Sequence, residues 1–380
     1  MKLAKRKIIV TTGTRAEYGI LRPILREIIK RKKLELILVV TGTHLSKKYG
    51  MTINEIKKDK FKIYQTFKFL PNNDTGFSVA KSLGEGVVQF AKIFKKIKPD
   101  INLILGDRDE MLASAIAAYH MNILNAHIHG GDVSGNIDEY TRHAITKISN
   151  IHFPATKKSK DRIVKMGENP KFVFSVGSSS IDDIKSGKIS SNESIEKKYG
   201  ITLSQKFIVL LYHPVTRINN IKNSIKLILN TVASFKLPTI IISPNSDSGS
   251  DIINSEIEKF EKKYNFVKLF SSIPRDDFLC LLNNSGILIG NSSSGIIEGS
   301  YLGTPVVNIG PRQNGREQSS NVINVKKESK ILIKNAIRNA LKTKRKKSLL
   351  YGNGNSSQKI IRYLEKIKLD DELMEKKLGY

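Results

Sequence analysis

The densest group of side chains that could do chemistry lies between residues 127 and 143. The chain there reads His127-Ile128-His129-Gly130-Gly131-Asp132, and then Asp138-Glu139 and Arg142-His143. Imidazole and carboxylate groups can transfer protons near neutral pH. His127, His129 and Asp132 are also residue types that bind metal ions. The stretch therefore predicts a proton-transfer site and leaves metal binding as an alternative.

Two motifs in the first half of the chain place charged residues beside glycine turns. They are Thr12-Gly13-Thr14-Arg15-Ala16-Glu17-Tyr18-Gly19 and Gly106-Asp107-Arg108-Asp109-Glu110. A glycine turn that opens a helix presents N–H groups to an anion, and a guanidinium suits phosphate. The alternatives are an ordinary strand–turn–helix unit with a surface arginine, and acids that only cap a helix.

The second half of the chain carries a further set of polar turns. They are His213-Pro214-Val215-Thr216, Ser243-Pro244-Asn245-Ser246-Asp247, Gly290-Asn291-Ser292-Ser293-Ser294-Gly295 and Gly310-Pro311-Arg312-Gln313. A turn rich in glycine and serine at the start of a helix is suited to hold phosphate groups. Glu298, in the helix that follows, could accept both hydroxyls of a ribose, or it could be a solvated helix acid. No dinucleotide-binding GxGxxG or Walker motif occurs.

Each of these motifs follows a short apolar run that predicts a strand. We expect strands at residues 7–12, 35–40, 101–105, 123–128, 151–153, 172–176, 207–213, 239–243, 266–270, 287–290 and 306–310. We expect helices at residues 17–31, 46–58, 78–97, 108–121, 138–149, 219–234, 249–263, 329–343 and 355–377. Apolar β-branched runs separated by helices are typical of a parallel sheet covered on both faces.

The strand–helix pattern is interrupted once. Residues 177–206 are polar, rich in serine and poor in strand signal, so we interpret them as a connector with a short helix. The chain is therefore predicted to be an α/β protein of two Rossmann-like doubly wound domains that face a cleft. Such sheets bind ligands at the carboxyl ends of their strands, so the ligand is expected in that cleft.

The amino-acid composition excludes several classes of protein for this chain. The 380 residues include 64 Lys and Arg against 35 Asp and Glu, a formal charge of +29. Lysines are scattered along the chain and tryptophan is absent, so we favour a charged surface over nucleic-acid binding. The single cysteine, Cys280, allows no internal disulfide and no cysteine-rich zinc site. No apolar run is long enough for a membrane span or a signal peptide, so we expect a cytoplasmic enzyme.

The motifs together resemble a known family. GTRAEYG, GDRDE, the HGGD–SGNID–RHAITK block, HPVT and GNSSSGIIEGSYLGTPVVNIGPRQNGRE occur in order within residues 7–325. They are similar to the hydrolysing nucleotide-sugar 2-epimerases, which form N-acetylmannosamine and UDP from UDP-N-acetylglucosamine. The resemblance implies a two-domain glycosyltransferase-B-like fold whose C-terminal helix crosses back to the first domain. It implies domains at 1–180 and 181–354, the second binding nucleotide, and a returning helix within 355–380.

The family's chemistry is an elimination followed by a hydration, and it implies no cofactor and no metal. A base removes the C2 proton while the nucleotide diphosphate leaves C1. Water then adds to the 2-acetamido glycal at C1, and C2 is protonated on the opposite face. By position, Asp107 and Asp138 match catalytic acids and His213 matches the histidine near the diphosphate. The family's nucleotide contacts are matched in this chain by Arg15, Arg108, Asn245, Ser292, Ser293, Glu298 and Arg312. Ile273 matches a backbone contact to the base.

One position departs from the family pattern. Many relatives have glutamate before the Gly-Gly pair, where this chain has His129. A neutral imidazole can serve as a base or a proton donor near pH 7, so His129 joins the candidate catalytic residues. Bacterial relatives in legionaminic acid synthesis carry a similar HIHGG sequence.

The resemblance therefore leaves the sugar open. UDP-N-acetylglucosamine is the leading substrate, and a UDP- or GDP-linked 2,4-diacetamido-2,4,6-trideoxyglucose is the alternative. A glycosyltransferase of the same fold is the alternative of another class. The family implies a homodimer or homotetramer, and we expect no nucleic-acid or membrane partner.

Overall fold

The chain forms two compact α/β units. The computed structural model describes residues 5–71, 75–135, 138–215, 220–244, 247, 249–377 and 379. The first unit comprises the described residues within 1–132, 137–182 and 352–380, and the second comprises those within 133–136 and 183–351. The C-terminal segment thus returns to the first unit, as the resemblance implied.

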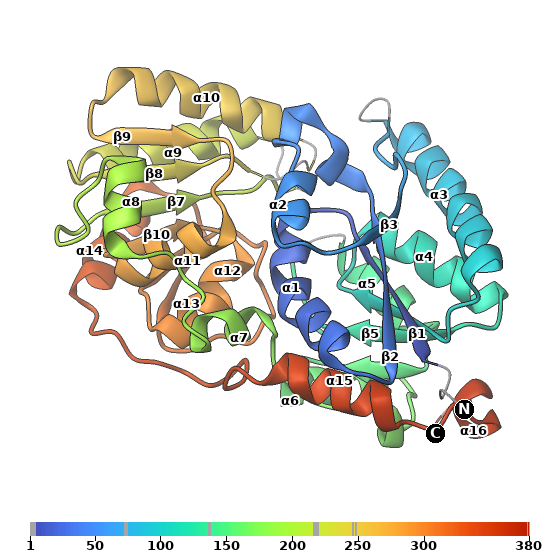
Figure 1. The fold of residues 1–380 in the computed structure, drawn as a ribbon. Helices are drawn as coiled ribbons and strands as arrows, with labels where there is room; N and C mark the ends of the chain where they lie inside the picture. Colours follow the sequence, from blue (N-terminus) through green and yellow to red (C-terminus); the bar gives the residue numbers. More distant parts are fainter. Residues whose placement is uncertain are drawn as a thin grey trace. The chain divides into compact units, whose positions relative to one another are not determined.

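The first unit is built on a parallel six-stranded sheet (Figure 1). Its strands, in the spatial order β3-β2-β1-β4-β5-β6, are β3 (Ile63–Thr66), β2 (Leu34–Val40), β1 (Arg6–Thr12), β4 (Ile101–Leu105), β5 (Leu124–Ile128) and β6 (Ile151–Phe153). Every residue of β4 and β5 is buried, because helices cover both faces of a sheet of this kind. The order reverses between β1 and β4, which is where doubly wound sheets bind their ligands.

Helices pack on both faces of the first sheet. The first face carries α1 (Arg15–Lys30), α2 (Ile53–Lys58) and α15 (Ser356–Lys366), and the other carries α3 (Gly76–Ile97) and α4 (Asp109–His120). Ile8 and Val10 face the first layer and Ile9 faces the second, which is the period-two alternation of a strand. The remaining helices are α5 (Asp138–Lys147), α6 (Lys157–Lys165), α7 (Ser180–Lys185), which begins in the first unit and ends in the second, and α16 (Asp371–Met374).

The second unit repeats the same topology. Its parallel strands lie in the order β12 (Val322–Val325), β11 (Val306–Ile309), β10 (Ile287–Gly290), β7 (Ile208–Leu211), β8 (Thr239–Ile242) and β9 (Val267–Phe270). One face carries α9 (Ile221–Ala233), α10 (Ser250–Lys263) and α14 (Lys330–Lys342). The other carries α8 (Asn192–Tyr199) and α11 (Arg275–Asn284), and α12 (Ser293–Ile296) and α13 (Glu298–Leu302) follow β10. The point of reversal here lies between β7 and β10.

The predicted α/β class with two doubly wound parallel sheets is confirmed, but several elements differ from the prediction. The prediction of a strand at 172–176 is wrong, because only Val173 forms a β-bridge, opposite His152. The helix predicted at 46–58 is shorter in the structure. It comprises only α2, which two short 3-10 turns precede. The helix expected at 355–377 is two helices, α15 and α16, because Asp370 caps a new start. The sequence analysis missed the short edge strands β3 and β12.

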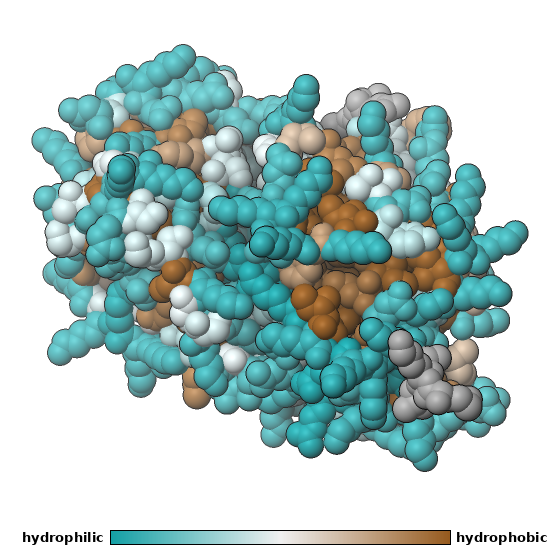
Figure 2. Space-filling model, viewed as in Figure 1, coloured by the Kyte–Doolittle hydropathy of each residue, from teal (hydrophilic) through white to brown (hydrophobic). Residues whose placement is uncertain are grey.

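The surface is strongly hydrophilic. Hydrophilic side chains are spread over the visible face of both units, with a smaller group of hydrophobic side chains on the first unit (Figure 2). Within the described residues, no helix combines the length and the apolar character that a membrane crossing requires.

Candidate active site

In the first unit, the candidate residues from the sequence motifs lie at the carboxyl ends of three neighbouring strands. Thr14 and Arg15 follow β1, Gly106 and Asp107 follow β4, and His129 follows β5. The Gly106 N–H donates to the carbonyl of Ile128 at 3.0 Å, so the turns after β4 and β5 lie side by side. The motifs separated in sequence by about twenty residues therefore meet at one sheet edge.

Arg142 is the centre of the acidic cluster. This α5 residue is 3% exposed, pairs through one guanidinium nitrogen with the Asp107 carboxylate, and donates through the other to the carbonyl of Asp132 at 2.8 Å. Burial disfavours the charged guanidinium, but the carboxylates of Asp107, Asp132 and Asp138 outweigh it and raise the pKa of Arg142 above its ordinary value. One buried cation thus pairs directly with Asp107 and interacts electrostatically with Asp132 and Asp138.

The imidazole ring of His127 contacts neighbouring protein groups through both of its nitrogens. Its Nε2 lies 2.7 Å from the Gly106 carbonyl, and its Nδ1 lies 3.1 Å from the Thr146 hydroxyl. Because a carbonyl only accepts, Nε2 carries the proton, and the Thr146 hydroxyl beside Nδ1 also donates to the Arg142 carbonyl at 3.0 Å. Burial lowers the pKa of His127 to about 3, so the ring is neutral. Both nitrogens are used, and among the described residues no three His, Cys, Asp or Glu side chains group as metal ligands.

His129 lies in a strained backbone conformation. Its φ of 61° is in the left-handed region, which non-glycine residues seldom adopt, and its side chain is buried. The N–H of His129 donates to the carbonyl of Phe153 at 3.0 Å, which fixes the turn after β5 against β6. Strain of this kind costs roughly 1–3 kcal/mol and is found most often at functional sites.

Two buried carboxyl groups, those of Glu17 and Glu110, lie next to the turn after β1. Glu17 accepts from the N–H groups of Gly13 and Thr14, each at 3.0 Å, as the N3 residue of a capping box. Glu110 is buried in α4 and pairs with Nε of Arg108 at 3.3 Å. Burial and then the charge of Glu110 raise the pKa of Glu17 to about 8. The turn that carries Arg15 therefore rests on a buried pair with one carboxyl protonated.

The second unit fixes His213 through Asn291. The His213 N–H donates to Oδ1 of Asn291 at 2.7 Å, and Nδ2 of Asn291 donates back to the His213 carbonyl at 2.9 Å. This reciprocal pair joins the turn after β7 to the turn after β10, across the point where the strand order reverses. The Asn291 carbonyl accepts in turn from Gln313 at 2.8 Å and from Arg312 at 3.3 Å.

The turn after β10 needs a glycine. Gly290 has φ 141°, and a Cβ there would lie 1.9 Å from the Leu211 carbonyl oxygen. The close approach lets Ser292 and Ser293 follow directly, with Ser292 accepting from the Ser294 N–H at 3.3 Å. Backbone amides and hydroxyls are thereby gathered at the strand exit.

Glu298 and Ile273 lie in the same unit. Glu298 is buried and accepts from Arg275 at 3.0 Å, and Ile273 is buried among the residues of the α8–α11 face. Arg312 also lies 3.9 Å from the carboxylate of Asp247. Asn245 lies outside the described residues. The structure thus brings His213, Ser292 and Arg312 to the ends of adjacent strands.

Sequence reasoning placed Arg142 and Asn291 within its motifs but missed the role of each in organising these sites. Arg142 follows Asp138 by four residues, which is the spacing of neighbours on a helix face, and this was the available signal. Asn291 stands between a glycine and a serine run, where nothing in the local pattern indicates a partner 78 residues away.

Comparison with known proteins agrees with the motif resemblance. A family model described as UDP-N-acetylglucosamine 2-epimerase matches residues 26–365. The chain is 40% identical to the UDP-N,N'-diacetylbacillosamine 2-epimerase (hydrolyzing) of Legionella pneumophila, covering 99% of this chain and all of the relative. It is 36% identical to the GDP/UDP-N,N'-diacetylbacillosamine 2-epimerase (hydrolyzing) of Campylobacter jejuni over 84% of each chain.

Solved structures show the same fold. The UDP-N-acetylglucosamine 2-epimerase of Neisseria meningitidis, solved with UDP-N-acetylglucosamine bound, has a TM-score of 0.82 to this chain. It is 20% identical and covers 95% of this chain and all of its own. This likeness shows the two-domain, glycosyltransferase-B-like fold that the sequence motifs implied.

Proposed function

Because the chain belongs to the UDP-N-acetylglucosamine 2-epimerase family, we propose that it is a hydrolysing 2-epimerase of a nucleotide-linked 2-acetamido sugar. The observation that carries this proposal is the acidic cluster of the first unit. Asp107, Asp132 and Asp138 surround the buried Arg142, beside the turn that holds His129. Elimination and reprotonation at one carbon need protic groups fixed in place, and this cluster supplies them.

The reaction follows as two balanced steps. A base takes the proton from C2, the bond between C1 and the diphosphate oxygen breaks, and a C1–C2 double bond forms as the nucleotide leaves with the electron pair. Water then adds at C1, and a proton is delivered to C2 from the opposite face. We assign the base and the acid to Asp107, His129 and Asp138. Arg142 keeps Asp107 in place and interacts electrostatically with Asp138, without itself transferring a proton.

The second unit is proposed to bind the nucleotide. Departure of a diphosphate is favoured by cations and N–H groups aimed at the leaving oxygens. Arg312, Ser292 and Ser293 supply such groups after β10 and β11, and His213 is held by Asn291 at the neighbouring strand. Glu298 and the backbone of Ile273 are assigned to the nucleoside, and Arg15 and Arg108 of the first unit to the phosphates.

For the sugar, we propose UDP-linked N,N'-diacetylbacillosamine, which is 2,4-diacetamido-2,4,6-trideoxyglucose. Two relatives that match 84% or more of this chain are named for that substrate. The second candidate is UDP-N-acetylglucosamine, which led the sequence analysis and is named in the description of the matching family model.

The test is a product assay by NMR in D₂O, with each sugar offered separately as its UDP and GDP derivative. The proposal expects release of nucleotide without any acceptor and a 2-epimerised sugar that carries deuterium at C2. Turnover of UDP-N-acetylglucosamine alone would move the substrate to the second candidate. Nucleotide release only when an acceptor is added would reject the epimerase and favour a glycosyltransferase.

Variants connect the assay to the cluster. Asp107→Asn and Asp138→Asn are each expected to lower kcat by roughly a hundredfold or more, the usual contribution of an acid–base residue. Asp161→Asn is the matched control, because Asp161 is exposed on α6. Wild-type rates in both cluster variants would contradict the assignment of these residues.

A further inference from the structure

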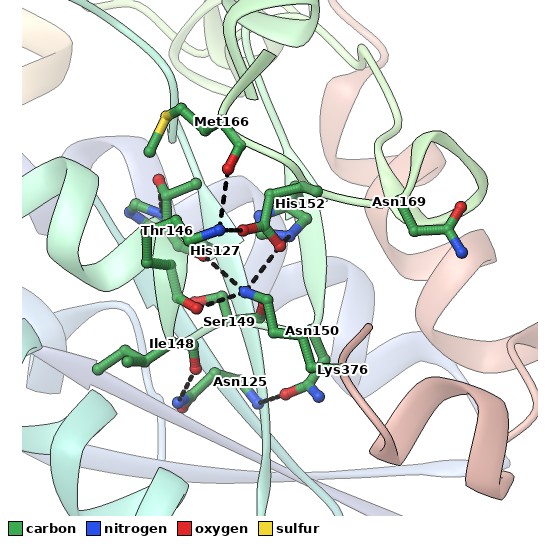
Figure 3. Close-up of polar contacts among 12 residues, drawn as sticks. Asn125, His127, Thr146, Ile148, Ser149, Asn150, His152, Met166, Asn169 and Lys376 are labelled. Atoms are coloured by element: carbon green, nitrogen blue, oxygen red, sulfur yellow. Dashed lines mark hydrogen bonds and ion pairs between the residues drawn. The ribbon is translucent and has the colours of Figure 1, made fainter. Parts of the chain in front are cut away.

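The last turn of α5 is closed by a residue from the far end of the chain. Nζ of Lys376 donates to the Ser149 carbonyl at 2.7 Å, to the Thr146 carbonyl at 3.4 Å and to the carbonyl of Lys147 (Figure 3). The last four carbonyls of a helix lack intrahelical partners, and a cation is favoured there by the helix dipole. Lys376 therefore acts as a C-terminal cap for the helix that carries Asp138 and Arg142.

The cap completes the hydrogen bonding of this helix end. The Ala144 carbonyl accepts from the Ile148 N–H at 3.2 Å, and the Ile145 carbonyl accepts from the Ser149 hydroxyl at 2.7 Å. Just beyond the helix, Ile148 accepts from Nδ2 of Asn125 at 3.0 Å, which ties the end to β5. Without Lys376, the carbonyl groups of Lys147 and Ser149 lose the only partners that the structure describes for them.

A buried carboxylate holds Lys376 in place. Glu168 lies 2.7 Å from Nζ of Lys376, 2.8 Å from Nζ of Lys147 and 3.2 Å from Nε2 of His152 (Figure 3). Burial favours the neutral carboxyl, but hydrogen bonds from His152, Lys147 and Lys376 outweigh it and lower the pKa of Glu168 to about 2. Glu168 is therefore negatively charged at neutral pH, and it orients both lysines at the end of α5.

The segment around Lys376 is anchored on both sides. Leu373 of α16 is 2% exposed in the core of the first unit, and its carbonyl accepts from Asn150 at 3.0 Å. After Lys376, the Gly379 N–H donates to the carbonyl of Gly167 at 2.9 Å. The ammonium is thus placed by its backbone as well as by Glu168.

We propose that Lys376 is a positioning residue for the acidic cluster, acting through α5. The inference rests on the proposed function. Arg142 lies four residues, about one helical turn, before Thr146, so the capped turn is stacked directly on the turn that pairs with Asp107. A frayed end would let Arg142 and Asp138 shift relative to Asp107, and displacements of about 1 Å can cost a hundredfold in rate.

The first experiment measures α5 directly and needs no substrate. Hydrogen exchange of residues 138–149 is compared in wild type, Lys376→Met and Lys377→Met, with α9 as the internal reference. Lys377 is the matched control, because its side chain is 85% exposed. We expect about tenfold faster exchange in Lys376→Met alone, from loss of the cap. Equal exchange in both variants would overturn the proposal.

The second experiment separates positioning from mere stability. The ratio of glycal released to 2-epimer formed, per nucleotide released, does not depend on how much enzyme is folded. Lys376→Met is expected to raise this ratio and to lower kcat by at least about tenfold, and Lys376→Arg is expected to restore part of both. Faster exchange with an unchanged ratio would overturn positioning. If wild-type protein releases no nucleotide, the proposed function fails, while the exchange result still decides whether Lys376 caps α5.

Discussion

The guanidinium of Arg142 pairs with the carboxylate of Asp107, joining helix α5 to the turn after strand β4. The two residues are 35 positions apart in sequence, and the pair is almost wholly buried on the arginine side. A buried pair of this kind is demanding in geometry, because either charge alone would be costly to keep out of water. It therefore fixes the distance between the first acid of the cluster and the helix that carries the second.

Removing the Arg142 guanidinium should damage both stability and activity. Arg142→Met leaves the partly buried Asp107 carboxylate without its cationic partner and is expected to cost about 3–5 kcal/mol of unfolding free energy. Arg142→Lys keeps the charge but loses the two-pronged geometry, so we expect a folded protein with kcat at least about tenfold lower. Denaturant unfolding and the product assay measure these effects. Arg338→Met, on the exposed face of α14, is the control, and equal losses in the two methionine variants would contradict the assignment.

Loss of the Asn291 side chain should release His213. Asn291→Ala deletes two hydrogen bonds that hold the backbone of His213, with an expected cost of roughly 1–3 kcal/mol for the groups left unpaired. We expect kcat/KM to fall by about tenfold or more, because His213 is no longer fixed beside the turn after β10. Steady-state kinetics compare this variant with Asn335→Ala, an exposed α14 residue. Unchanged kcat/KM in Asn291→Ala would show that the position of His213 does not matter.

Gly290→Ala should be among the most damaging single substitutions. The new methyl group would lie 1.9 Å from the Leu211 carbonyl oxygen, and the backbone there has φ 141°. The main chain must move to accommodate it, so we expect a loss of more than about 3 kcal/mol and poor nucleotide binding. Thermal unfolding and UDP titration are the measurements. Gly286→Ala, where the nearest atom lies at 3.4 Å, should be tolerated, and comparable losses in both variants would refute the steric argument.

Glu17 should make stability depend on pH. Its pKa is raised to about 8 by burial and by Glu110, so the folded protein holds a proton that the unfolded chain releases above its ordinary glutamate pKa. Stability from this group is complete below about pH 4.5 and is lost as the pH rises through about 8. Glu17→Gln is neutral at all pH values and should flatten this decline in a series of thermal unfolding curves.

The control for Glu17 is another glutamate of the same unit. Glu35→Gln, on the exposed side of β2, should leave the decline with pH unchanged. A wild-type slope in Glu17→Gln would mean that the proton resides elsewhere. Glu110→Gln is then the informative variant, because the charge of Glu110 is one of the causes that raise the pKa of Glu17.

The sequence by itself determined the α/β class, the doubling of the sheet and most of the positions at which polar turns follow strands. Apolar runs of five or six residues with β-branched side chains predict buried parallel strands, and β4 and β5 are buried throughout. Motifs such as the Gly106–Glu110 turn were found because ligand-binding residues of doubly wound sheets lie just after strands. The edge strands β3 and β12 were missed because short, half-exposed strands lack a continuous apolar run.

Tertiary structure alone decided which of these residues act together. His127 and His129 are two positions apart and look equivalent in sequence, but the first is locked between Gly106 and Thr146, and the second lies in a strained turn. The roles of Arg142, Asn291 and Lys376 were found through hydrogen-bond partners 35, 78 and 227 residues away. The physical reason is that strand order and helix packing bring distant turns into contact, and local patterns carry no information about which turns will meet.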